Sequence, residues 1–204
     1  MARPRQITDE QILQTMRSSV LQHGPAVSLD LVAEQLNVTS PALIKRFGTR
    51  RALMIAALKP PEDNAWLRKL AAGPDERPLQ VQLEEIIIAF SESFAEAMPC
   101  MFALRESGIP LAEVFPPSEV PPQVRVVRAA TRWLSQLADR GVVEGSALET
   151  AATALVGAVS TRAVTAHLTR TPWSLKAQRE YARQLSQLFT RALTPDNRKS
   201  KPTP

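Results

Sequence analysis

The stretch that decides the fold is residues 28–53, which read SLDLVAEQLNVTSPALIKRFGTRRAL. Ser28 is a preferred helix N-cap residue, and Asp30 would lie in the positive first turn of the helix that follows. The apolar side chains of this segment recur at helical spacing, at Leu29, Val32 and Leu36. Asn37 tolerates a left-handed backbone and can end the helix in a tight turn. The segment therefore predicts a short capped helix followed by a turn.

A second short helix is predicted directly after that turn. Thr39 or Ser40 can cap it, and Pro41 is tolerated in a first helical turn because its missing N–H needs no partner there. Leu43 and Phe47 fall four residues apart and would face the core. Two short helices joined by a tight turn predict a helix-turn-helix motif.

The residues around the motif predict two more short helices. Thr8 and Gln11 have the spacing of a capping box, so a helix should begin there and end near Gly24. Thr49 can cap another helix that includes Leu53 and Ala57. The first 58 residues are therefore expected to form a small helical domain.

The rest of the chain also predicts helices, and we found no alternating strand pattern. The expected helices cover residues 78–98, 99–108, 120–140 and 146–169, with a last one through Tyr181–Ala192. Pro99 is expected to bend or end the first of these, because proline disfavours the helical region at the residue before it. The predicted fold is all-α, with a helix-turn-helix domain at 1–58, a helical domain at 59–193 and a disordered tail at 194–204.

The 120–140 helix carries an apolar pattern of its own. The side chains expected on its buried face are Val120, Val124, Val127, Thr131, Leu134 and Ala138.

Composition narrows the function classes. Of 204 residues, 44% are hydrophobic and 22% charged, which suffices for a core. The single cysteine, Cys100, excludes a disulfide framework or a cysteine-rich zinc site, and we expect a reducing, cytoplasmic compartment. We expect neither a secretory signal nor a membrane span, because no long apolar run is present. With only 7 glycines and no nucleotide-binding or catalytic motif, we expect no cofactor, no metal site and no enzymatic activity.

The positive charge is concentrated at the N-terminus. Residues 1–59 hold eight Lys or Arg against four Asp or Glu. A basic helix-turn-helix would place the N-terminal residues of its second helix in the major groove of double-stranded DNA. The residues expected to contact DNA are Arg3, Arg5, Ser28, Thr39, Ser40, Pro41, Ala42, Ile44, Lys45, Arg46, Arg50 and Arg51. Arg3 and Arg5 would act as a minor-groove arm.

Residues 8–58 resemble the DNA-binding domain of the tetracycline-repressor (TetR) family. The resemblance rests on Val32, Ala33, Leu36, Val38, Thr39, Leu43, Phe47 and Leu53. The family pattern has Gly, Tyr, His and Lys where this chain has Asn37, Ile44, Arg46 and Arg50. Ile44 cannot donate a hydrogen bond to a phosphate, so Lys45 and Arg46 are expected to supply that affinity.

The resemblance implies a dimeric bacterial repressor that binds an inverted-repeat operator and releases it on binding a small, largely apolar effector. The implied C-terminal domain binds the effector and dimerises. Candidate effector-pocket residues are Phe90, Phe94, Met98, Met101, Phe102 and Trp133. Candidate dimer-interface residues are Leu155, Val159, Tyr181, Leu185, Leu188 and Phe189, beside a helix rich in small residues.

Two other functions remain open from the sequence. One is an all-α small-molecule-binding bundle or enzyme without a DNA role. The other is a helix-turn-helix regulator that a protein partner controls. An apolar internal cavity would favour control by a small effector over control by a protein partner. Binding that does not depend on salt concentration would argue against any DNA role.

Overall fold

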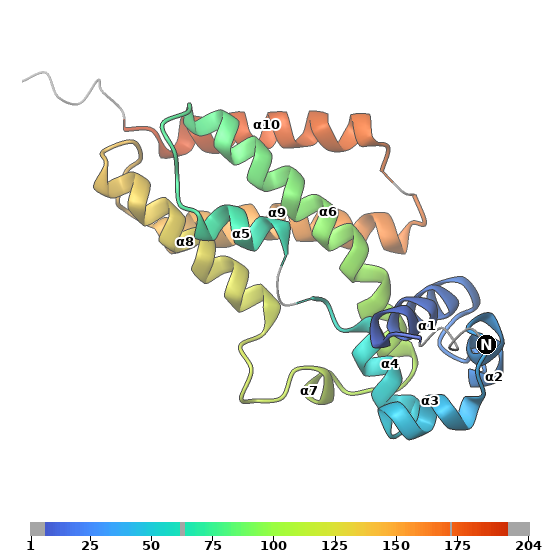
Figure 1. The fold of residues 1–204 in the computed structure, drawn as a ribbon. Coiled ribbons are helices and arrows are strands. Elements are labelled where there is room, and N and C mark those ends of the chain that lie inside the picture. The colour runs from blue at the N-terminus through green and yellow to red at the C-terminus, as the bar shows by residue number, and fades with distance from the viewer. Residues whose placement is uncertain (1–6, 62–63, 172, 196–204) are drawn as a thin grey trace, which may run out of the picture. The chain divides into compact units, whose positions relative to one another are not determined.

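The computed structural model describes residues 7–61, 64–171 and 173–195, and within these ranges the regular elements are all helices (Figure 1). Their bounds are α1 Asp9–His23, α2 Leu29–Gln35, α3 Ser40–Phe47, α4 Arg50–Leu58, α5 Ala65–Ala71, α6 Leu79–Glu106, α7 Leu111–Val114, α8 Pro122–Asp139, α9 Leu148–Leu168 and α10 Leu175–Leu193. The all-α prediction is confirmed. Most of the tail expected at 194–204 lies outside the described residues.

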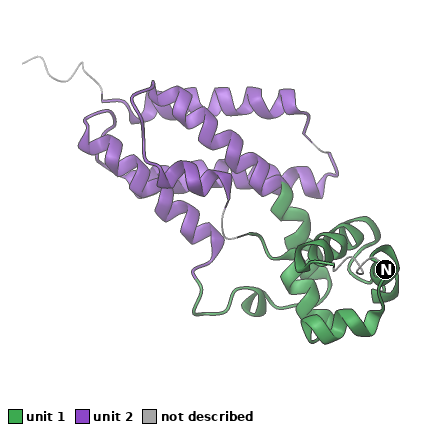
Figure 2. Cartoon of the chain, viewed as in Figure 1, with its two compact units in different colours: residues 1–61, 96–119 green, residues 62–95, 120–204 purple. Residues whose placement is uncertain are grey.

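The chain forms two compact units, coloured separately in Figure 2. Unit 1 comprises residues 1–61 and 96–119, and unit 2 comprises residues 62–95 and 120–204. Unit 1 is therefore discontinuous in sequence, and α6 contributes residues to both units.

Unit 1 has its own hydrophobic core. In it, α1 packs against α4 and α2, and α3 packs against α2 and α4. The first segment buries Met16, Val32, Leu43, Leu53 and Leu58 almost completely, and the second segment adds Cys100, Leu104, Ile109 and Val114 to the same cluster. These late residues cover apolar surface that the first four helices leave open.

A partly buried hydrogen bond also joins α1 to the end of α4. The Nε atom of Arg17 donates to the carbonyl of Ala57 at 2.7 Å. This bond supplies a donor to one of the last carbonyls of α4, which have no partner within the helix.

Unit 2 is a helical bundle in which α8 packs against both α5 and α9. Trp66 of α5 and Phe90 of α6 meet edge to face with ring centroids 5.2 Å apart. Trp133 and Leu134 of α8 are buried in the same cluster.

Pro99 was expected to bend or end the helix predicted at 78–98, and the expectation that the helix would end there is wrong. α6 is one 28-residue helix with Pro99 in its interior. Proline has no N–H to donate to the carbonyl of Ala95 four residues earlier, which removes one helical hydrogen bond. Burial of Cys100, Ala103 and Leu104 after the proline offsets that loss and keeps the chain helical.

α6 is also the one described helix that is long and apolar enough to cross a membrane by length and composition. A core helix passes the same test, and the buried side chains of α6 belong to the two hydrophobic clusters.

The buried face of α8 differs from the sequence expectation. Its buried side chains are Val126, Ala130, Trp133, Leu134 and Leu137. Val120 and Val124, expected to be buried, are 41% and 39% exposed. The face is rotated toward Trp133 and Leu137, whose burial removes more apolar area from water than burial of Thr131 and Ala138 would.

Candidate nucleic-acid interface

The turn between α2 and α3 forms as the sequence predicts. The hydroxyl oxygen of Ser28 accepts from the backbone N–H of Leu31 at 3.3 Å and caps α2. Asn37 has a φ of +54°, in the left-handed region that asparagine tolerates. The backbone N–H of Val38 donates to the carbonyl of Ala33 at 2.9 Å, which closes the turn.

α3 is anchored by one side and exposed on the other. Leu43 is buried in the unit 1 core, and Phe47 and Ile44 are half-buried. Thr39, Pro41, Ala42 and Lys45 are exposed, and Ser40 is partly exposed. We call these last five residues the recognition face. They are the N-terminal and outward positions of a helix that could enter a major groove.

The two hydroxyl groups at the start of α3 differ in their hydrogen bonding. Thr39 is the N-cap residue, but its side chain makes no capping hydrogen bond. The hydroxyl of Ser40 donates to the carboxylate of Asp30 on the first turn of α2. Asp30 was not among the residues predicted to belong to the site.

The two cations of α3 also differ. Lys45 makes no hydrogen bond or ion pair to the part of the chain that the structure describes, so its ammonium group is available to a ligand. Arg46 forms an ion pair with Asp9 and donates to the carbonyl of Ile7 at 2.7 Å. In the free protein, Arg46 therefore holds α3 against the start of α1.

Both arginines at the start of α4 have intramolecular partners. Thr49 caps the helix as expected, its hydroxyl accepting from the N–H of Ala52 at 3.0 Å. Arg50 donates to the carbonyls of Pro25 and Val27 at 2.6 and 2.8 Å. These bonds tie α4 to the loop before α2.

Arg51 is held by an acidic residue. It donates through Nε and Nη2 to both carboxylate oxygens of Glu113, each at 2.7 Å. The hydrogen bonds from this guanidinium lower the pKa of Glu113 below its usual range. Both side chains are about half exposed, so the pair is open to solvent.

A second ion pair lies at the other end of α4. Lys59 Nζ is 2.7 Å from Glu119 Oε2 and also lies over the ring of Phe115. The segment that carries Glu113 and Glu119 thus pairs with a cation at each end of α4.

Comparisons with known proteins bear on this arrangement. No protein-family model matches the chain, and no curated protein matches it. Solved structures do match. A protein from Mesorhizobium loti described as a TetR-family transcriptional regulator is 12% identical, with a TM-score of 0.72 over 92% of this chain and 96% of that one. The chain has the TetR-family fold.

Two further structures support this conclusion. A TetR-family transcriptional regulator from Pectobacterium atrosepticum is 21% identical, with a TM-score of 0.59 over 96% of this chain and 95% of that one. A flavonoid-responsive regulator is 18% identical, with a TM-score of 0.53 over 92% of this chain and 97% of that one.

The predicted effector residues are divided between the two units of the TetR fold. Phe90 and Trp133 are 0% and 3% exposed, in the core of unit 2, and Phe94 packs partly buried against that core. Met101 packs against the core of unit 1, and Met98 and Phe102 are half-buried. The two cavities described next are lined by other residues.

The predicted dimer residues are in part buried within the protomer. Leu155, Val159 and Leu185 belong to the unit 2 core, and Phe189 packs partly buried against it. Tyr181 is half-buried and donates its hydroxyl hydrogen to the carbonyl of Ala158 at 3.1 Å. Leu188, in contrast, is 61% exposed.

An open groove of about 1090 Å³ runs along α9 and α10. Small side chains line much of it, including Ala154, Gly157 and Ala158. Arg162 lies over the rings of Trp173 and Tyr181, with its guanidinium carbon 3.8 and 4.4 Å from the two centroids. The groove is a surface onto which another helical surface could pack closely.

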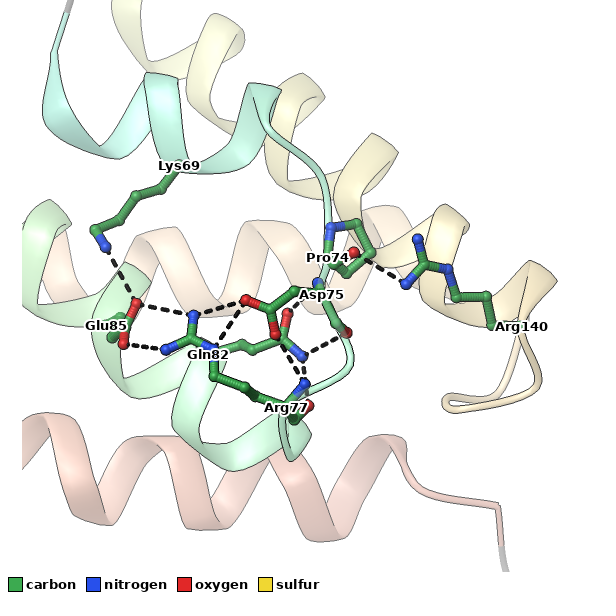
Figure 3. Close-up of polar contacts among 7 residues, drawn as sticks. All are labelled: Lys69, Pro74, Asp75, Arg77, Gln82, Glu85 and Arg140. Atoms are coloured by element: carbon green, nitrogen blue, oxygen red, sulfur yellow. Dashed lines mark hydrogen bonds and ion pairs between the residues drawn. The ribbon is translucent and has the colours of Figure 1, made fainter.

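Unit 2 also contains a polar cluster that sequence reasoning missed, shown in Figure 3. We call Asp75, Arg77, Gln82 and Glu85 the loop clasp. Arg77 pairs with Asp75 at 2.7 Å and Glu85 at 2.6 Å, and its hydrogen bonds lower the pKa of both carboxyl groups. Buried Gln82 donates to the carbonyls of residues 75 and 77 at 3.1 and 2.6 Å. The clasp fixes the loop before α6.

A cavity of about 520 Å³ adjoins the clasp, and Arg140 and Leu137 are among the residues that line it. Arg140 donates to the carbonyl of Pro74 at 2.9 Å. Every member of the clasp has a partner within the protein, so the cluster is accounted for by loop structure. Across the described residues, no three His, Cys, Asp or Glu side chains are grouped as metal ligands would be.

Two of the predicted DNA contacts, Arg3 and Arg5, lie outside the described residues.

Proposed function

We propose that this protein is a sequence-specific DNA-binding transcriptional regulator. The observation that carries the proposal is the exposed recognition face on a capped helix-turn-helix, in which Lys45 is not engaged by any described residue. The TetR-family fold, found in solved transcriptional regulators, supports the same conclusion. We place this activity in the bacterial cytoplasm, where such a regulator meets its DNA.

The recognition face has the chemistry needed to read base edges. Thr39 and Ser40 offer hydroxyl groups, while Pro41 and Ala42 can lie against a thymine methyl group. Lys45 can pair with a phosphate or with the acceptor edge of guanine. Phosphate contacts fix the position of the helix, whereas the base contacts supply sequence preference.

We propose that the protein acts as a homodimer on an inverted repeat. One short helix contacts too few base pairs for selectivity, and a twofold pair of helices doubles the number. The groove along α9 and α10, together with the exposed side chain of Leu188, supports an interface at this surface. Gly157 and the alanines there would allow the helices of a second copy to approach closely.

We further propose that a small, largely apolar effector controls DNA binding. The likeness to a flavonoid-responsive regulator supports effector control. Release of DNA requires only that the effector bind one conformation of the protein more tightly than the other. Repression follows if the operator overlaps a promoter.

The first experiment is selection of genomic DNA fragments by the purified protein at about 0.15 M salt, an ionic strength that screens weak electrostatic contacts. Recovery of one inverted repeat supports the proposal. Recovery of random fragments would reject sequence-specific regulation.

A set of variants then tests the recognition face. Lys45→Ala should weaken binding to the selected site and reduce the slope of log affinity against log salt by about one, because one phosphate contact is lost. Arg46→Ala should weaken binding less, because Arg46 is already paired with Asp9. Lys176→Ala is the matched control, since it removes an exposed lysine from α10. Equal effects of Lys45→Ala and Lys176→Ala would remove Lys45 from the interface.

A further inference from the structure

The start of the recognition face contains a hydrogen bond whose direction is fixed by chemistry. Ser40 is the first residue of α3, and Asp30 lies in the first turn of α2, ten residues earlier in the chain. The tight turn at Asn37 brings the two side chains together. An ionised carboxylate has no hydrogen to donate, so the Ser40 hydroxyl must be the donor.

This direction limits what Ser40 can offer to a ligand. A free serine hydroxyl has one hydrogen to donate and two lone pairs that accept. With the hydrogen directed at Asp30, the exposed side of Ser40 Oγ can only accept. The neighbouring Asp30 oxygens also only accept, so the pair forms a local acceptor surface.

The adjacent hydroxyl has no such restriction. Thr39 makes no capping hydrogen bond, and no other bond from its side chain to a described residue is present. The Thr39 hydroxyl can therefore donate its hydrogen to an acceptor or accept a hydrogen bond from a donor. The two neighbouring hydroxyls of the recognition face therefore differ in what they can offer a ligand. Ser40 can only accept a hydrogen bond, whereas Thr39 can donate or accept one.

We propose that Asp30 is a positioning residue for base selection, which makes Ser40 select a base with an exocyclic amino group. In the major groove, adenine offers its N6 amino group and cytosine its N4 amino group as donors. Guanine O6 and thymine O4 are acceptors, and their lone pairs would face the lone pairs of Ser40 Oγ. One position of each half-site should therefore prefer adenine or cytosine over guanine or thymine. This inference rests on the DNA-binding function proposed above.

The negative charge of Asp30 has a second effect, which the test must separate. A carboxylate near DNA repels phosphates and weakens binding to all sequences. Removing Asp30 should therefore raise affinity in general as well as change the preference at one position. Glu34 provides the matched control, because it is an exposed acid one turn further along α2, with no side-chain contact to Ser40 among the described interactions.

The experiment is selection from a random double-stranded DNA library with the full-length protein and three variants, Asp30→Ala, Ser40→Ala and Glu34→Ala. Circular dichroism of each variant checks that the helices remain. The readout is the base frequency at each half-site position. We expect the wild type and Glu34→Ala to favour adenine or cytosine at one position by about ten-fold, the size of one good base contact. Asp30→Ala and Ser40→Ala should reduce that preference to less than about three-fold.

The outcomes separate this inference from the proposed function. If all four proteins select the same half-site with the same preference, the protein binds DNA specifically but the Asp30–Ser40 pair does not set base choice. If Glu34→Ala abolishes the base preference as Asp30→Ala does, loss of negative charge explains the change and the inference is rejected. If the wild type selects no sequence, the proposed function fails and this inference fails with it.

Discussion

Phe90 offers a direct test of whether a predicted effector-pocket residue is instead part of the core. Its side chain is 0% exposed and lies edge to face with Trp66, with centroids 5.2 Å apart. A residue that lines an open effector cavity would have fewer neighbours. Substitution of Phe90 by Ala should therefore lower the free energy of unfolding much more than the same substitution of a residue that lines a cavity.

The magnitude follows from what the substitution removes. Replacing a fully buried phenylalanine by alanine costs about 3–5 kcal/mol, from lost apolar burial and the cavity left behind. The edge-to-face pair with Trp66 contributes about 0.5–1.5 kcal/mol, and its loss places the value for Phe90 in the upper part of the first range. For a chain of this size, the loss lowers the midpoint of thermal unfolding by roughly 6–20 °C.

The assay is thermal and urea unfolding followed by circular dichroism, with Leu175→Ala as control. Leu175 is 69% exposed, so its truncation should change stability by less than about 0.5 kcal/mol. A loss below about 1.5 kcal/mol for Phe90→Ala would refute the reasoning, because a tightly packed site does not lose a phenyl ring at so small a cost. The region around Phe90 would then be loosely packed and open to an effector.

Three further predictions concern the surface of the molecule. Leu188→Glu should leave the helical content unchanged and convert a dimer to monomers in sedimentation, because Leu188 is 61% exposed in the protomer; a dimer that persists would place the interface elsewhere. Glu113→Gln should release Arg51 to a phosphate and steepen the salt dependence of DNA binding by about 0.9 per half-site, whereas an unchanged slope would show that Arg51 does not reach DNA. Arg77 lowers the pKa of both clasp carboxyl groups, so its stabilising effect should be present above about pH 4 and lost as the pH falls through their lowered pKa values. Arg77→Ala should thus be less stable than wild type at neutral pH and equal to it in acid; a difference that persists in acid would contradict this.

Local features of the fold could be predicted from the sequence because their causes are local. The capping box at Thr8 and Gln11, the caps at Ser28 and Thr49, and the left-handed Asn37 are all confirmed. Each depends on residues no more than a few positions apart, so short-range hydrogen bonding decides them.

The sequence-based predictions failed where burial in the tertiary structure outweighs local conformational preference. Pro99 disfavours a helix locally, but the side chains after it are buried, and α6 continues. On α8, several helical faces fit the apolar pattern, and burial of Trp133 decides among them. The sequence does not say which neighbouring helix a face will meet.

The candidate interface divides in the same way. The sequence predicts which residues α3 exposes, since helical periodicity is enough for that. It does not predict that Asp9, Asp30 and Glu113 pair with Arg46, Ser40 and Arg51, because most of these partners come from distant segments. The positions of the polar groups could thus be predicted, but not which of them are free to bind a ligand.

The discontinuity of unit 1 has a consequence for recombination and for protein engineering. A gene fragment that ends near residue 61 encodes the helix-turn-helix but omits Cys100, Leu104, Ile109 and Val114, which complete its core. Such a fragment would expose the apolar surface that these side chains cover and would tend to aggregate. Swapping DNA specificity between regulators of this architecture therefore requires grafting individual residues onto α2 and α3, or exchanging two separate segments together. A new specificity should evolve more readily by point substitution than by exchange of N-terminal gene fragments.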